Sequence, residues 1–321
     1  MNRLRVVFDG NNTAYRANCV NELCTKSGLR TSAIVGVLNI THAVMEELNK
    51  KLELPVAEVI YAWDFGHSER RKALFPEYKA NRKKEKTKDE KLWMKEFIDQ
   101  ANTLNEALPF FGIKCIKKAG WEGDDLIYGV TEALKKKYPD DRVIIVSTDE
   151  DFHQLVQDNV NIYSPIKKIL YTQKNYQRLM GIPQDRFLTY KILKGDSSDG
   201  IGGIPGIGEK TAKSLVNQYG KLENLLSAPV RLELMKSKRT QKIFTLEGLQ
   251  TLDRNNKLIN LKDYVDLSDI EDDINELIAE EPLVDGKLAR NFLMKYQITS
   301  ILVKWGEWIE PFEEMTGVFD D

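Results

Sequence analysis

Three short apolar runs, each followed at once by polar and acidic residues, constrain the fold of this 321-residue chain most. They span residues 5–8 before Asp9, residues 59–63 before Asp64, and residues 143–146 before Ser147, Thr148 and Asp149. Runs of this length and composition predict buried strands. Between them, apolar residues recur at helical spacing over 33–52, 92–108 and 124–138. This alternation predicts an α/β fold with a parallel sheet and helices on both faces.

Weaker strand patterns occur at residues 113–116 and 160–163. From about residue 186 the pattern changes to a helix over 187–194, a glycine-rich stretch over 195–208 and a helix over 209–218. This change predicts a small second domain, which agrees with roughly 100–200 residues per domain. Helical segments near 271–279 and 287–296 belong either to a third packing layer or to a partly mobile tail.

The composition is that of a soluble globular protein, with 42% hydrophobic and 30% charged residues. No apolar run approaches the roughly 18 residues of a membrane-spanning helix, so we expect neither membrane insertion nor export. Three cysteines and three histidines show no zinc-site spacing and form no disulfide framework. We therefore expect a reducing, cytoplasmic location.

The overall charge of −2 hides two unlike segments. Residues 70–88 hold nine Lys and Arg against two Glu, a local charge of +7. Residues 263–321 hold sixteen Asp and Glu against four basic residues, a charge of −12. A charge run is often only a solvated helix face, but a dense basic patch also suits a polyanionic partner such as a nucleic acid.

Nine carboxylates stand in five separate segments that the predicted topology brings to one sheet edge. They are Asp9, Asp64, Glu122, Asp124, Asp125, Asp149, Asp151, Asp196 and Asp199. The carboxyl ends of parallel strands meet at this edge, where open sheets bind their ligands. A single acid after a strand is more often a turn or cap residue. Nine converging acids, however, would repel one another unless hard divalent cations such as Mg²⁺ neutralise them.

Two other readings of the acids and glycines fail on particular residues. A haloacid-dehalogenase-type phosphatase needs a second Asp two positions after the first, and Asn11 stands there. The stretch from Gly203 to Ala212 is no Walker loop, because its spacing between Gly and Lys is too long and no strand precedes it. Its glycines before a helix suit a hairpin that binds phosphates through backbone amides without reading sequence, although such glycines can also simply turn the chain.

These motifs together resemble the 5′-nuclease (flap endonuclease) family, especially bacteriophage 5′→3′ exonucleases (phage RNase H) and the nuclease domain of bacterial DNA polymerase I. The resemblance rests on Phe-Asp-Gly-Asn at 8–11, Phe-Pro-Glu-Tyr-Lys-Ala-Asn-Arg at 75–82, Trp-Glu-Gly-Asp-Asp at 121–125, Ser-Thr-Asp-Glu-Asp-Phe at 147–152 and Gly-Asp-Ser-Ser-Asp-Gly followed by the hairpin at 195–208. It implies a PIN-like domain over 1–185 with a helical arch at about 66–108. A helix-hairpin-helix (H3TH) subdomain over 186–262 and an acidic region over 263–321 follow. No polymerase domain follows in this sequence, as in the free-standing relatives.

The resemblance also implies the roles of individual residues. Two Mg²⁺ ions, replaceable by Mn²⁺, would be held by two sets of the nine acids. The first is Asp9, Asp64, Glu122 and Asp124, and the second is Asp149, Asp151 and Asp199 with Asp196 nearby. Asp125 would act through water. Lys79 and Arg82 would act on the scissile phosphate, with an exposed arch cation as the alternative.

DNA-binding roles are implied for Tyr78, Lys83, Lys84, Gly203, Gly206, Gly208 and Lys210, with K⁺ at the hairpin. Tyr78 would stack on an end base or pack within the arch.

The implied function is a structure-specific 5′ nuclease that removes RNA primers and 5′ flaps during replication in a bacterial or phage-infected cell. Its substrates would be DNA and RNA:DNA hybrids with flaps, nicks or ends. A non-catalytic DNA-junction binding protein and a PIN-type endoribonuclease are the alternatives. A non-catalytic binding protein would not need nine acids. PIN-type endoribonucleases share the sheet and the acids but lack the glycine-rich hairpin that this sequence has. Trp305, Trp308, Phe312 and Phe319 are candidate apolar anchors among acids. For Trp305 and Trp308, packing against the protein's own core is an equal alternative, so we expect only residues 311–321 to bind a sliding clamp or single-strand-binding protein.

Overall fold

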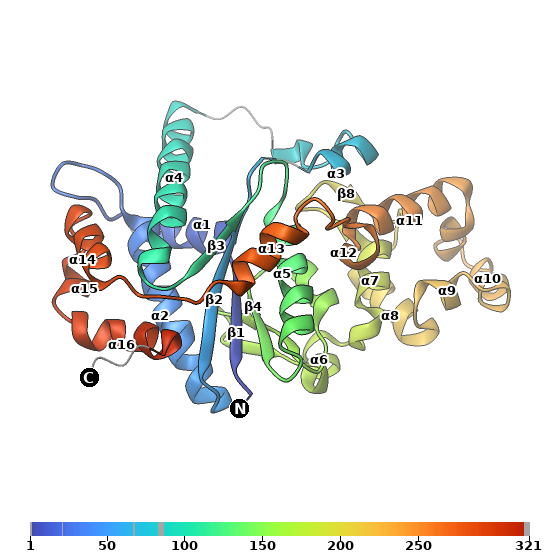
Figure 1. Ribbon diagram of the computed structural model, residues 1–321. Coiled ribbons are helices and arrows are strands. Elements are labelled where there is room, and N and C mark those ends of the chain that lie inside the picture. Colours follow the sequence, from blue (N-terminus) through green and yellow to red (C-terminus); the bar gives the residue numbers. More distant parts are fainter. Residues whose placement is uncertain (1, 21, 67, 83–86, 318–321) are drawn as a thin grey trace.

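The structure, a computed structural model, describes residues 2–20, 22–66, 68–82 and 87–317. Its centre is a six-stranded sheet in the order β3-β2-β1-β4-β5-β6 (Figure 1). The strands are β1 (Leu4–Asp9), β2 (Val56–Trp63), β3 (Lys114–Lys117), β4 (Arg142–Val146), β5 (Val160–Ser164) and β6 (Ile169–Tyr171). Strands β1 to β5 are parallel, and β6 pairs antiparallel with β5. The predicted fold class is confirmed, and within this sheet only the short edge strand β6 was not predicted.

Side chains alternate across the sheet, so each face has its own apolar core. Leu4, Val6 and Phe8 face α1 (Gly10–Val20), α2 (Ser32–Leu52) and α4 (Lys88–Ala107), and the Phe8 ring stacks on Tyr61 at 4.7 Å. Val7 points to the other face, against α5 (Gly123–Lys137). This burial on both faces explains why the strands read as continuous apolar runs. The helices predicted over 33–52, 92–108 and 124–138 are confirmed as α2, α4 and α5.

The glycine-rich region lies beside α5 and completes the core of that face. It contains α7 (Phe187–Lys194), the two-stranded β7 (Gly195–Asp196) and β8 (Ile201–Gly202), α8 (Glu209–Tyr219), α9 (Leu222–Leu225), α10 (Ala228–Leu234) and α11 (Leu246–Ile259). Ile204, Leu215 and Leu252 belong to the same buried cluster as Val7. This lobe and the sheet therefore share one core. The remaining short helices are α3 (Glu69–Leu74), α6 (Gln173–Met180), α12 (Leu261–Tyr264) and α15 (Thr299–Leu302).

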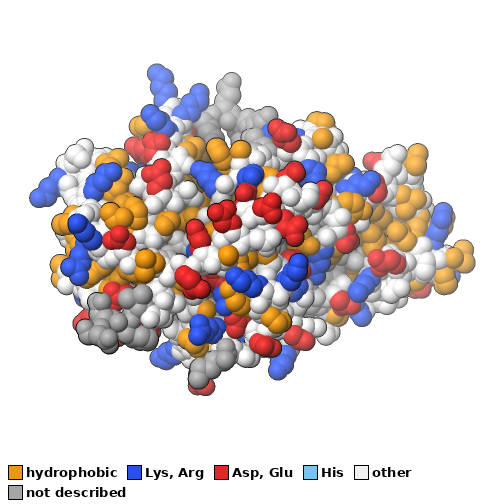
Figure 2. Space-filling view, viewed as in Figure 1, with side chains coloured by type: hydrophobic (Ala, Val, Ile, Leu, Met, Phe, Trp, Pro, Cys, Tyr) orange, Lys and Arg blue, Asp and Glu red, His pale blue; other side chains and the backbone are white. Residues whose placement is uncertain are grey.

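The acidic region returns from the lobe and crosses the sheet domain as a packed layer. Helix α13 (Glu271–Ala279) packs on α5 and β3, and its acids contribute to a group of acidic side chains across the centre of one face (Figure 2). Helices α14 (Gly286–Lys295) and α16 (Trp305–Thr316) then join the other core. Of the two alternatives for this region, a packing layer is correct for the residues that the structure describes.

The expectation that residues 311–321 form an interaction peptide is wrong for its described part. Phe312 is fully buried and Met315 nearly so, because α16 lays its apolar face on α2. Trp308 is also buried and stacks on His42 at 5.3 Å. These side chains stabilise the fold and are not available as partner anchors. Phe319 lies outside the described residues. No described helix is long and apolar enough to cross a membrane.

Candidate active site

The acids that end the strands meet at the carboxyl edge of the sheet, as the topology predicts. Asp9 ends β1, and its carboxylate accepts hydrogen bonds from the Asn12 amide at 3.0 Å and the Ser147 hydroxyl at 2.9 Å. Asp64 follows β2, and its Oδ1 accepts from the Gly123 amide at 2.5 Å. The Ser147 hydroxyl also accepts from the Asp149 amide at 3.0 Å. Ser147 thus connects two strand-end acids, a role that sequence analysis did not assign.

Seven of the nine predicted carboxylates line one cleft of about 620 Å³. They are Asp9, Asp64, Glu122, Asp124, Asp149, Asp151 and Asp199. Asp125 and Asp196 are not among the lining residues. Both are buried and engage basic side chains within the protein. The structure therefore brings the predicted acids together but divides them between the cleft and the layer beneath it.

Arg71 is the buried cation beneath one side of the cleft. Its side chain is only 2% exposed, and its guanidinium lies 2.7 Å from Glu122, 3.0 Å from Asp124 and 2.8 Å from Asp125. Burial alone would lower the pKa of Arg71, but these acids raise it well above its ordinary value. Oxygen atoms of the three acids lie within 4.8 Å of one another, so Arg71 supplies the positive charge that allows this spacing.

Lys191 plays the corresponding part on the other side. Its ammonium nitrogen lies 2.7 Å from Asp151 Oδ1 and 2.6 Å from Asp196 Oδ2. Asp196 also accepts hydrogen bonds from the backbone amide of Ser198 at 2.8 Å and its hydroxyl at 2.6 Å. Burial would raise the pKa of Asp196, but Lys191 and Ser198 outweigh it and lower the pKa to about 2. Sequence analysis missed both buried cations.

Asp9, Asp64 and Asp149 form no ion pair with any described basic side chain. Burial, and then the charge of Asp64, raises the pKa of Asp9 to about 7. Burial also raises the pKa of Asp149 to about 6 and raises that of Asp64. These acids have no positive partner of their own, and hard divalent cations suit such a set of carboxylate oxygens.

The arch segment from Tyr78 to Arg82 closes over the cleft. The Lys79 amide donates to the Asp199 carbonyl at 2.8 Å, and its ammonium group donates to Glu122 Oε1 at 2.9 Å. Lys79 adopts a left-handed backbone conformation with φ 55°, which few non-glycine residues tolerate. Arg82 donates to Asp199 at 2.7 Å, and its side chain is 56% exposed. Both predicted cations therefore face the acids.

Tyr78 is buried within the arch. It is 3% exposed, and its hydroxyl lies 2.9 Å from Glu122 and 3.0 Å from Asp199. Its ring is not available to stack on a base in this conformation, which favours the arch-packing alternative. Lys83 and Lys84 lie outside the described residues.

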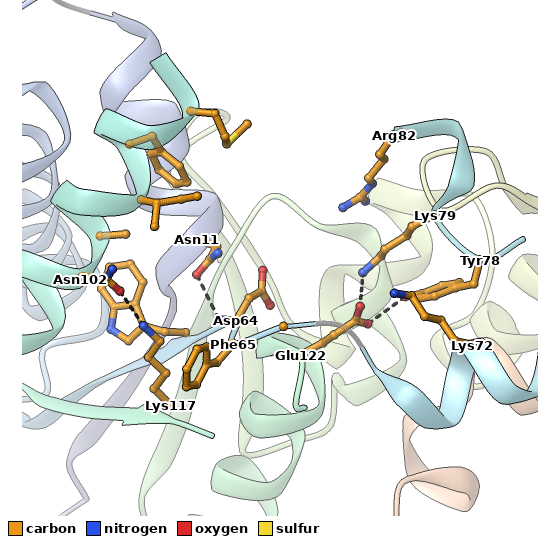
Figure 3. A pocket seen from close by; sticks show the side chains of 16 residues that line it. Asn11, Asp64, Phe65, Lys72, Tyr78, Lys79, Arg82, Asn102, Lys117 and Glu122 are labelled. Atoms are coloured by element: carbon orange, nitrogen blue, oxygen red, sulfur yellow. Dashed lines mark hydrogen bonds and ion pairs between the residues drawn. The ribbon is translucent and has the colours of Figure 1, made fainter. Parts of the chain in front are cut away.

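A second pocket of about 530 Å³ continues from the cleft past Asp64 and Glu122 (Figure 3). One wall is apolar, formed by Met94, Phe97 and Ile98 of α4. Phe65 at its edge is 51% exposed, and the Lys117 ammonium lies 4.7 Å from its ring centroid. Apolar surfaces and cations thus border the same passage.

The glycines of the hairpin serve two different needs. Gly203 is held against the backbone of Leu193 and Lys194, where any Cβ would clash. Gly206 has φ 87°, and both it and Gly208 are exposed with room beside them. Gly208 precedes α8 without a side-chain cap, so amides of the first turn remain available to an anion. Lys210 is exposed in that turn.

Comparison with known proteins gives consistent matches over most of the chain. Residues 5–181 match the family described as 5′-3′ exonuclease, N-terminal resolvase-like domain. Residues 182–282 match the 5′-3′ exonuclease, C-terminal SAM fold.

Among curated proteins, a 5′-3′ exonuclease of Buchnera aphidicola is 31% identical over 68% of this chain and 72% of its own length. DNA polymerase I of Rhizobium leguminosarum is 30% identical over 73% of this chain, but the match spans only 22% of that protein. The chain thus spans about a quarter of the DNA polymerase I relatives.

Solved structures share the fold at lower identity. The T5 5′-exonuclease with bound zinc has a TM-score of 0.66 and 22% identity, covering 91% of this chain and 99% of that one. The bacteriophage T5 D15 flap endonuclease, in a complex with DNA and metal ions, has a TM-score of 0.64 and 21% identity, covering 92% of this chain and 100% of that one.

Proposed function

The chain belongs to the 5′-3′ exonuclease family, and on this premise we propose that it is a structure-specific 5′ nuclease. It hydrolyses phosphodiester bonds in DNA and RNA:DNA duplexes with 5′ flaps, nicks or ends, and so removes RNA primers and flaps during replication. Its site of action is the cytoplasm of a bacterial or phage-infected cell. One observation carries the proposal: seven acids from separate segments line one cleft beneath Lys79 and Arg82.

The acids divide into two candidate ligand sets for divalent ions. The first is Asp9, Asp64, Glu122 and Asp124, with Asp125 acting through water. The second is Asp149, Asp151 and Asp199, with Asp196 nearby. Two Mg²⁺ ions bound there, or Mn²⁺ in their place, would activate the attacking water and stabilise the leaving oxygen. Carboxylate oxygens alone, without histidine or cysteine, suit these ions.

The protein's own cations complete the chemistry. Lys79 and Arg82 contact Glu122 and Asp199 at the mouth of the cleft, where a bound phosphate would compete for them. They would then stabilise the charge that develops as water attacks. Arg71 and Lys191 keep the acids beneath in place throughout.

Two surfaces would hold the substrate on either side of the acids. The amides of Gly206 and Gly208, with Lys210 and a K⁺ ion at the hairpin, would bind backbone phosphates of the duplex. The unpaired 5′ strand would pass into the second pocket, with bases against Phe65 and Ile98 and phosphates near Lys117. In this proposal, residues 1–185 form the nuclease domain, residues 186–262 the helix-hairpin-helix subdomain that binds DNA, and residues 263–321 the acidic region. A sliding clamp or single-strand-binding protein remains a proposed partner, which would have to use a surface other than the buried face of α16.

One assay tests the proposal against its alternatives. The protein is given 5′-labelled flap, nicked-duplex and RNA:DNA substrates with Mg²⁺, with Mn²⁺ or with excess chelator. We expect cleavage near the junction only with metal. Junction binding without cleavage in Mg²⁺ would favour the non-catalytic binding protein. Preferred cleavage of single-stranded RNA would favour an endoribonuclease.

A further inference from the structure

A basic segment beside the hairpin, residues 236–242, has no role in the function argued so far. It links α10 to α11 and has the sequence Lys-Ser-Lys-Arg-Thr-Gln-Lys, with four cations and no carboxylate. All four basic side chains are exposed. Among the residues that the structure describes, none of the four forms an ion pair. Their charge is therefore available to an external anion.

The segment is held in a fixed conformation. Thr240 is buried, and its hydroxyl donates to the Leu234 carbonyl. The Gln241 amide donates to the Ser237 carbonyl at 2.9 Å, and Ile243 is buried immediately afterwards. The backbone of the segment therefore loses little conformational entropy when a partner binds, and the entropic cost is confined to the exposed Lys and Arg side chains.

The segment lies directly against the hairpin. A Cβ atom built on Gly206 would be 3.8 Å from Cγ of Arg239. Between α8 and the segment runs a groove of about 380 Å³, lined on one side by Thr211 and Ser214 and on the other by Lys236 and Ser237. Glu233 also lines the groove as its one carboxylate among the described lining residues, and it accepts a hydrogen bond from the Tyr219 hydroxyl at 2.7 Å. Thr211 at one end of the groove is three residues after Gly208 of the hairpin, so the groove begins beside the hairpin.

The groove and the segment present hydroxyl groups, ammonium groups and one guanidinium. Side-chain donors of these kinds contact phosphates in protein–DNA complexes. We propose that residues 236–242 form a second contact with the sugar–phosphate backbone of duplex DNA, continuing from the hairpin amides along the groove beside α8. This inference rests on the proposed function, which it deepens by assigning a further part of the duplex surface. Binding through phosphates makes this contact independent of base sequence.

The test is the salt dependence of binding, measured without cleavage. Lys236, Lys238, Arg239 and Lys242 are all changed to Gln, and the dissociation constant for a blunt duplex of fixed length is measured in chelator across a range of KCl concentrations. We expect the slope of log Kd against log salt to fall by about 2 to 4, at about 0.9 per phosphate contact. A matched control changes four exposed lysines elsewhere, Lys50, Lys136, Lys174 and Lys295, to Gln, and should keep the wild-type slope.

Two outcomes would overturn the inference. One is an unchanged slope in the quadruple variant, and the other is an equal loss of affinity for a single strand of the same length. If the quadruple variant does not fold, the single changes Arg239→Gln and Lys236→Gln should each lower the slope by about one. Wild-type cleavage of nicked duplex in Mg²⁺ is measured alongside. Its absence would count against the proposed function, whereas an unchanged slope with cleavage intact would count only against the second contact.

Discussion

Two groups of carboxylates around the cleft differ in what neutralises them. Glu122, Asp124 and Asp125 form ion pairs with Arg71, whereas Asp9, Asp64 and Asp149 form none with any described basic side chain. Burial would raise the pKa of Asp124, but Arg71 and Lys79 outweigh it and lower the pKa. Asp9 is just as deeply placed but has no basic partner, and burial together with Asp64 raises its pKa to about 7. The fold thus supplies permanent positive charge to one group and leaves the other to an external cation. The acids paired with Arg71 are therefore held in place without a metal. The net charge of the cleft depends on whether a cation binds to the acids that have no basic partner.

The sharpest test of this comparison is the change Asp149→Asn. Asp149 belongs to the group without a cation, so removing its charge should lower the occupancy of a divalent ion without altering the DNA-binding surface. We expect cleavage of a flap substrate to fall by about 10³-fold or more, because bound metal contributes several kcal/mol to the transition state. Junction affinity in chelator should stay within about twofold of wild type. Near-normal cleavage would show that Asp149 is not a ligand.

The change Arg71→Met should mainly affect stability. It leaves the buried Glu122 and Asp125 and the partly exposed Asp124 without the cation that they share, and removing one partner of such a cluster costs about 3–5 kcal/mol. Urea unfolding measures the free energy. The control is Arg82→Met, whose partly exposed pair with Asp199 should be worth less than about 1 kcal/mol. Equal effects of the two changes would contradict the assigned role of Arg71.

Lys79→Ala should reduce turnover more than affinity. A cation that acts on developing charge contributes chiefly to the transition state, so we expect single-turnover cleavage to slow by about 10²-fold. The dissociation constant should change by less than about threefold. Lys91→Ala, an exposed change on α4, provides the control. A variant altered only in its dissociation constant would identify Lys79 as a binding residue.

The smallest expected effect is on the pH dependence of the metal-free protein. The Asp9 carboxyl has a pKa of about 7 in the folded state and an ordinary value of 3.8, so between about pH 4 and 7 the folded state binds more protons. Its contribution to stability therefore falls as pH rises through this range. Added Mg²⁺ should raise Tm at both pH values, and the rise should be larger at pH 8 than at pH 5.5 by about 2–4 °C. Calorimetry measures this difference, and Asp9→Asn should diminish it.

Sequence reasoning located the sheet edge because its signal is local. Each strand is a short apolar run, and the acid that ends it is adjacent in sequence, so topology alone brings Asp9, Asp64 and Asp149 together. Arg71 gives no such signal, because it is one of nine basic residues in a run that reads as a solvated face. Its burial depends on Glu122 and Asp124, some fifty residues later.

Lys191 offered a clearer signal. It stands in α7 among Phe187, Tyr190 and Ile192, on a helix whose neighbouring residues are buried. A lysine at such a position needs a carboxylate partner, although the sequence does not say which one. The end of the chain misled for the opposite reason. Phe312 among acids resembles an exposed anchor, and only the packing of α16 on α2 shows that it is covered.

The order of the strands has a consequence for how the protein is made. Strand β1 is synthesised before the other strands of this sheet, yet it lies between β2 and β4, and both of its neighbours are present only once residues up to Val146 have been made. At about 5–20 residues per second, synthesis leaves β1 without its second neighbour for roughly 7 to 27 seconds. The cleft needs still more chain, because Lys191 and Asp199 come later. A growing chain therefore carries an apolar strand with one open edge well before it carries the complete cleft, and chaperones that shield such edges should matter most in that interval.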